Sequence, residues 1–79
     1  MMSNRLVKTD ELQIGGQVYS VKYFETRTKR GALRYSSELR LGPDDRIILD
    51  GNSLTALESK VARLVPATVY SRMLAARAA

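Results

Sequence analysis

The stretch that decides the fold is Leu33-Arg34-Tyr35-Ser36-Ser37-Glu38-Leu39-Arg40-Leu41. Its odd positions carry four large apolar or aromatic side chains, and its even positions are all polar. This alternation predicts a β-strand with one buried face, because successive side chains of a strand point to opposite sides. The stretch therefore indicates an antiparallel sheet that covers a core with one face and meets solvent with the other.

The segment before it, residues 18–28, predicts a strand with Tyr19, Val21 and Tyr23 on one face. A three-residue loop, Lys29-Arg30-Gly31, brings the two apolar faces together, whereas a two-residue loop sets Tyr23 against a polar neighbour. Gly31 then takes the left-handed position of a G1 bulge, so we expect a positive φ there. The resulting register places Val21 opposite Leu39, Tyr19 opposite Leu41 and Lys22 opposite Glu38.

The N-terminal part is expected to contribute one short strand. Gly15-Gly16 predicts a two-residue type I′ turn, since both of its positions need positive φ values. Residues 1–11 lack periodicity and are expected to form a flexible N-terminal segment. Order is expected to begin near Leu12, so the single small α+β domain spans residues 12–79.

The C-terminal part is expected to be one short strand followed by helix. Gly42-Pro43-Asp44-Asp45 predicts a turn before a strand over 46–49. Ser53 is one candidate N-cap, and Thr55 is another because Glu58 completes a capping box with it. Apolar residues then recur at helical spacing: Leu54, Leu57, Val61, Leu64 and Val65. Pro66 predicts an end or a kink, with a second helix over roughly 67–77.

These elements predict an α+β fold: an antiparallel meander of three to four strands with one or two C-terminal helices packed on its apolar face. The expected core consists of Ile14, Tyr19, Val21, Tyr23, Leu33, Tyr35, Leu39, Leu41, Ile47, Leu49, Leu54, Leu57, Val61 and Leu64. Over residues 18–65 the element order is similar in topology to the sheet-plus-helix modules of phage integrase arm-binding domains and plant AP2-type transcription factors. No shared motif accompanies this topology and the chain has no Trp, so we assign no family and transfer no residues.

The composition excludes several kinds of active site. The 79 residues include no Cys and no His, which removes Cys nucleophiles, Ser-His-Asp triads and zinc sites built on those ligands. Neither a P-loop nor a dinucleotide-binding glycine motif is present. Asp44, Asp45 and Asp50 do not match the spacing of a calcium loop, and turn formation and helix capping explain them. We therefore expect no enzyme, no cofactor, no metal and no small-molecule substrate.

We found no targeting signal and no apolar run long enough to span a bilayer, so the expected location is cytoplasmic. The net charge of +5 is unevenly distributed. Residues 18–41 hold six basic and two acidic side chains, and residues 60–79 hold four basic side chains and no acidic one. The outer face and tip of the 18–41 hairpin gather the candidate nucleic-acid-binding residues: Lys22, Phe24, Lys29, Arg30, Arg34 and Arg40.

Two functions remain open. The first is a small non-catalytic interaction domain of unassigned specific function that self-associates as a homodimer or binds another protein. A chain of this size without disulfides or a metal gains stability by oligomerising. The second is a nucleic-acid-binding module, in which Phe24 stacks on an unpaired base. Against the second, Glu38 lies among the cations, and a solvated sheet face explains Lys and Arg equally well.

Overall fold

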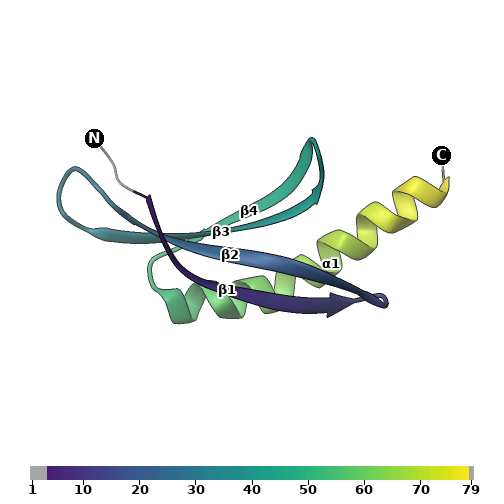
Figure 1. The fold of residues 1–79 in the computed structure, drawn as a ribbon, viewed down its shortest axis with the longest axis horizontal. Coiled ribbons are helices and arrows are strands. Elements are labelled where there is room, and N and C mark those ends of the chain that lie inside the picture. Colours follow the sequence, from purple (N-terminus) through teal and green to yellow (C-terminus); the bar gives the residue numbers. More distant parts are fainter. Residues whose placement is uncertain (1–3, 79) are drawn as a thin grey trace.

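The computed structural model describes residues 4–78 and confirms the α+β class (Figure 1). Four antiparallel strands form one sheet in sequence order, and a single C-terminal helix packs against it. The elements are β1 (Asn4–Ile14), β2 (Gln17–Arg27), β3 (Leu33–Gly42), β4 (Asp45–Gly51) and α1 (Leu54–Ala78). The helix α1 lies along one face of the sheet, and no element of the described residues covers the other face (Figure 1).

The predicted register of the central hairpin is confirmed from Val21 to Arg27, and the predicted pair of Tyr19 with Leu41 lies beyond the observed pairs. Val21 pairs with Leu39 and Lys22 pairs with Glu38. The backbone N–H of Thr28 donates to the carbonyl of Ala32 at 2.8 Å, which closes the three-residue loop. Gly31 has φ +84°, the left-handed conformation that a G1 bulge requires. The Gly15-Gly16 turn is confirmed as well, with φ values of +58° and +81°.

The prediction that order begins near Leu12 is wrong, because β1 begins at Asn4. A bulge between Leu6 and Lys8 shifts the alternation of β1 by one residue, which hides its strand pattern. After the bulge, Lys8 and Asp10 lie on the helix-facing side, opposite Tyr23 and Val21. Charged residues on the inward side are a common feature of edge strands. Because they stand where apolar residues are expected, the sequence shows no alternation of apolar and polar residues here. Residues 1–3 of the expected flexible segment lie outside the described residues.

The expected break at Pro66 is also absent: one helix runs through Pro66 from Leu54 to Ala78. Proline removes one backbone donor, but burial of Val65 and Val69 on either side of it favours continuation. Ser53 is the N-cap, since its hydroxyl accepts a hydrogen bond from the Ala56 N–H at 3.1 Å. The Thr55 alternative therefore falls away, because Thr55 lies inside the first turn.

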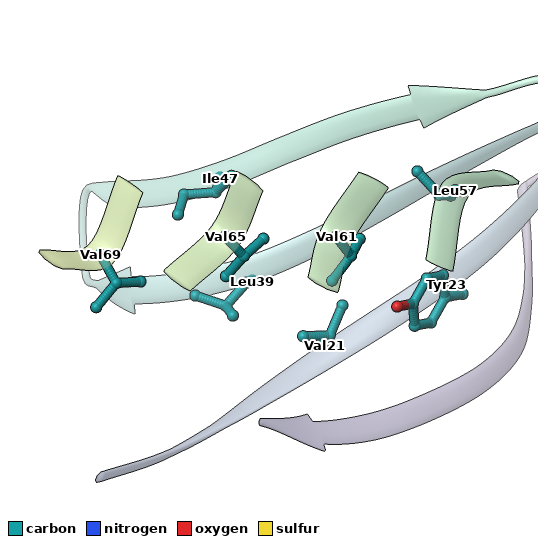
Figure 2. Close-up of a cluster of buried hydrophobic side chains, with 8 residues drawn as sticks. All are labelled: Val21, Tyr23, Leu39, Ile47, Leu57, Val61, Val65 and Val69. Carbon is teal, nitrogen blue, oxygen red and sulfur yellow. The ribbon is translucent and has the colours of Figure 1, made fainter. Parts of the chain in front are cut away.

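The core is a single layer of side chains between α1 and the sheet. Leu57, Val61, Val65 and Val69 form a row along the helix, and Figure 2 shows this row lying over the sheet residues Tyr23, Val21, Leu39 and Ile47. Most of the predicted core is buried or packed against these residues. Leu33 and Leu64 were predicted wrongly, because both are exposed. The helix buries Val65 and Val69 instead, which continue the four-residue spacing from Leu57.

Candidate interaction surfaces

The face of the sheet opposite α1 carries no covering element within the described residues, and we call it the open face. Side chains alternate along each strand, so the pairing register defines its members. It comprises Asn4, Leu6, Thr9, Glu11 and Gln13 of β1, Val18, Ser20, Lys22, Phe24 and Thr26 of β2, Arg34, Ser36, Glu38 and Arg40 of β3, and Arg46, Ile48 and Asp50 of β4. The open face is therefore mostly polar and mixed in charge, with Leu6 and Phe24 as one cross-strand apolar pair and Val18 and Ile48 as further apolar side chains.

The structure divides the predicted site residues between two places. Lys22, Phe24, Arg34 and Arg40 lie on the open face, whereas Lys29 and Arg30 occupy the β2–β3 loop. The sequence prediction missed Arg46, which lies directly opposite Arg40 on β4. The short apolar run after Arg46 gave no sign of which face this arginine would take.

Carboxylates offset part of this positive charge. Glu38 forms an ion pair of 3.7 Å with Arg46. Arg34 donates a hydrogen bond to the Asn52 side-chain oxygen, which directs it along the rim of the sheet. Asp50 is exposed on β4. The centre of the open face is therefore close to neutral. Cations lie at both ends: Arg34 lies toward the β2–β3 loop, and Arg40 and Arg46 lie toward the β3–β4 turn.

Phe24 borders a shallow hollow of about 630 Å³ on the open face. The ring is half-buried, and the residue opposite it on β3 is the small Ser36. Thr26 and Arg34 line one side of the hollow, and Ile48 and Asp50 line the other. Phe24 thus lies away from α1, with Leu6 of β1 as its neighbour on the other side.

A second surface lies on α1, on a side separate from the row that contacts the sheet. Leu64, Ala67, Ser71 and Leu74 are all exposed and follow one another at intervals of three, four and three residues. We call these four residues the helix stripe. Leu64 is 38% exposed and Leu74 is 48% exposed. The sequence contained this spacing, but the expected break at Pro66 divided it between two helices.

Two charged contacts fix the position of α1 on the sheet. Lys8 of β1 forms an ion pair with Glu58 of α1 and a second pair with Asp10 at 3.0 Å. Its ammonium lies 5.3 Å from the centre of the Tyr23 ring. The hydrogen bond to Glu58, followed by that to Asp10, raises the pKa of Lys8 above its ordinary value. Near the other end of the helix, Arg72 pairs with Asp45 of β4.

Burial and neighbouring carboxylates raise the pKa values of two tyrosines on the helix-facing side of the sheet. Burial raises the pKa of Tyr23, and the nearby Asp10 carboxylate adds to the increase. Desolvation and then the hydrogen bond that it donates to Glu25 at 3.2 Å raise the pKa of Tyr35. Arg5 also pairs with Glu25, at 3.1 Å. Both shifts favour the neutral phenol in the folded protein.

Within residues 4–78, α1 lacks the continuous apolar length that a bilayer-spanning helix needs. Asp45 and Asp50 lie at opposite ends of β4, so the acidic residues of the sequence do not form one group. Comparison with known proteins identifies no relative: no family model, no curated protein and no solved structure matches the chain.

Proposed function

We propose that this protein is a small non-catalytic interaction domain that associates with a second copy of itself through the helix stripe. The observation that carries this proposal is the exposure of Leu64, Ala67, Ser71 and Leu74 at heptad-like spacing. Alternating intervals of three and four residues align side chains along one side of a helix and favour packing against another helix. The sheet does not use this side of α1.

The order of side chains in the stripe makes it self-complementary. It reads leucine, small residue, small residue, leucine in both directions. An antiparallel second copy therefore sets Leu64 against Leu74 of its partner and Ala67 against the partner's Ser71. Small residues at the centre let the two helix axes approach closely, and the leucines at both ends bury apolar surface. A two-fold symmetric contact of this kind closes at two chains.

The antiparallel arrangement is favoured by two electrostatic features. Opposed helix dipoles attract each other, whereas parallel dipoles repel. Lys60 precedes the stripe by four residues. Its ammonium donates a hydrogen bond to the Asp50 carbonyl of β4 at 2.6 Å. A parallel pair would place both Lys60 charges at the same end of the contact, and the antiparallel pair separates them.

The thinness of the core supports association. The described part of the chain buries eight hydrophobic side chains in one layer, and the sequence has no cysteine for a disulfide. Domains of this size are marginal on their own and often gain stability by oligomerising. Pairing through α1 would cover the helix while leaving the open face accessible.

Sedimentation equilibrium tests the proposal with a matched pair of variants. We expect the wild-type chain to approach twice its 8.8 kDa mass as the concentration rises. Leu74→Lys should remain a monomer, because it places a charge in the apolar contact. Ile48→Lys introduces the same charge at an equally exposed position of the open face and should still dimerise. A monomeric wild type at all concentrations, or loss of the dimer in Ile48→Lys alone, would contradict the proposal.

A further inference from the structure

The β2–β3 hairpin carries a concentration of positive charge. Residues 27–34 include Arg27, Lys29, Arg30 and Arg34, with no carboxylate among them. All four are exposed, and none of them forms an ion pair within residues 4–78. Arg27 lies on the helix-facing side of β2 and donates a hydrogen bond to the Gly31 carbonyl at 3.2 Å, so Arg34 is the strand cation on the open face. A protruding loop of this kind attracts polyanions, because its field is not cancelled locally. We call these four residues the hairpin tip.

The hollow beside Phe24 lies next to the hairpin tip. Arg34 belongs to both, since it lines the hollow and also ends the basic segment. The hollow offers an aromatic ring, the hydroxyls of Thr26 and Ser36, and the carboxylate of Asp50. Its volume of about 630 Å³ lies within the range of pockets that hold a small organic group.

We infer that the open face binds a single-stranded nucleic acid, with backbone phosphates at the hairpin tip and an unpaired base stacked on Phe24. The charge of the tip is complementary to phosphate, and the neutral centre of the face suits bases rather than backbone. Stacking needs an aromatic surface that a base can reach, which the small Ser36 leaves accessible. Asp50 lies opposite Ser36 on β4, lines the hollow and can accept a hydrogen bond from a base amino group.

The carboxylates thus fit the proposed orientation. Asp50 and Glu38 would repel a phosphate chain that ran along the middle of the sheet. Asp50 lies in the same cross-strand row as Ser36 and Phe24, and Glu38 lies one row farther from the hairpin tip, where the bases would lie. A duplex does not meet these requirements, because its bases stack on each other and are unavailable to Phe24.

Fluorescence anisotropy with labelled oligo-dT and oligo-U of about 12 nucleotides tests this inference, since that length covers one binding surface of this size. We expect Phe24→Leu to weaken binding about tenfold, because it removes the stacking surface and keeps apolar bulk. Val18→Ala is the control, since Val18 is an exposed apolar residue of β2 outside the hollow. Ser36→Leu is the second test, because it fills the hollow and leaves Phe24 in place. Circular dichroism verifies the fold of each variant.

The charge part of the inference has its own matched pair. Lys29→Gln/Arg30→Gln and Arg63→Gln/Arg77→Gln each remove two cations, the first from the hairpin tip and the second from α1. Only the first should weaken binding and reduce the slope of log affinity against log salt, by about 1.4 between about 50 and 200 mM. Comparison of dT with U distinguishes a DNA ligand from an RNA ligand.

The following results would overturn the inference: no binding of either oligonucleotide at the lower salt, equal affinity for a duplex, full affinity in Phe24→Leu and Ser36→Leu, or equal loss in both charge variants. These outcomes are independent of the proposed dimer. The helix stripe and the open face share no residue, and self-association is measured without nucleic acid.

Discussion

Val21 of β2 lies directly opposite Leu39 of β3, and each of these side chains is about 1% exposed. This pair fixes the register of the central hairpin and places both residues under α1, where Val61 and Val65 cover them. A slip of one residue between β2 and β3 would turn one of these side chains to the open face and set the other against a polar neighbour. The same pair of residues therefore sets the register of the hairpin and provides the surface on which the helix packs.

We predict that Leu39→Ala lowers the free energy of unfolding by roughly 2–5 kcal/mol, because it leaves a cavity in a core one layer thick. The control is Leu33→Ala, which truncates an exposed leucine of the same strand and should have a much smaller effect. Chemical denaturation measures both. Equal stability of Leu39→Ala and wild type would contradict the assignment of the buried face.

The central hairpin could be predicted because the strand pattern and the loop residues indicate the same register. Alternation in residues 33–41 defined the buried face, and Gly31 defined the loop that brings two such faces together. The first strand could not be predicted in the same way. A bulge interrupts its alternation, and its helix-facing charges are compensated by Glu58, which is distant in sequence.

The helix shows how a strong local rule can be overridden. Pro66 indicates a break, and the burial of Val65 and Val69 against the sheet outweighs it. The same error concealed the helix stripe. In the candidate nucleic-acid site, the alternation of apolar and polar residues along β2 and β3 was enough to assign the hairpin residues to one face of the sheet. Their relation to Ile48 and Asp50 of β4 needed the register of the third hairpin.

Gly31→Ala is predicted to destabilise the fold by about 1–2 kcal/mol. No atom lies within 4 Å of an added Cβ, so the cost is the strain of an L-residue at φ +84° rather than a clash. Gly42→Ala meets equally open space without a positive φ and should be close to wild type. A thermal melt of Gly31→Ala that overlays that of Gly42→Ala would refute this explanation of the loop.

Pro66→Ala is predicted to raise the free energy of unfolding by roughly 2 kcal/mol. Alanine restores a backbone donor inside α1, and this gain exceeds the loss of the stiffness that proline gives the unfolded chain. Far-ultraviolet circular dichroism should retain the helix signal, and denaturation should occur at higher urea concentration. A less stable variant would mean that the local shape at Pro66 contributes to packing.

Stability is predicted to fall at alkaline pH. The fold raises the pKa of Tyr23 by burial and that of Lys8 by hydrogen bonds to Glu58 and Asp10. Both shifts favour the protonated form in the folded state, so their contribution is complete below the unfolded values of about 10 and 10.4. It is lost as the pH rises through the higher folded values. Melting temperatures measured across this range should decline less in Tyr23→Phe and Lys8→Met than in wild type. A parallel decline in all three proteins would contradict this assignment.

Self-association through the helix stripe should not weaken with salt. Lys60, Arg63 and Arg77 lie near the stripe, so salt screens repulsion between the two copies. Nucleic-acid binding at the hairpin tip should respond in the opposite direction, because phosphate contacts release counterions. Sedimentation equilibrium at low and high salt measures the first effect. A dimer that dissociates as salt rises would indicate a contact held by ion pairs rather than by leucines.

The most direct test of the central claim, that two copies pair along α1, is a disulfide cross-link. The chain has no cysteine of its own, so introduced thiols report contacts without background. Ala67→Cys and Ser71→Cys proteins are mixed under mild oxidation, and the products are distinguished by mass. The antiparallel pair predicts that the mixed disulfide forms faster than either symmetric one. Cross-linking no faster than that of Val18→Cys on the open face, or symmetric Ala67→Cys dimers as the main product, would contradict it.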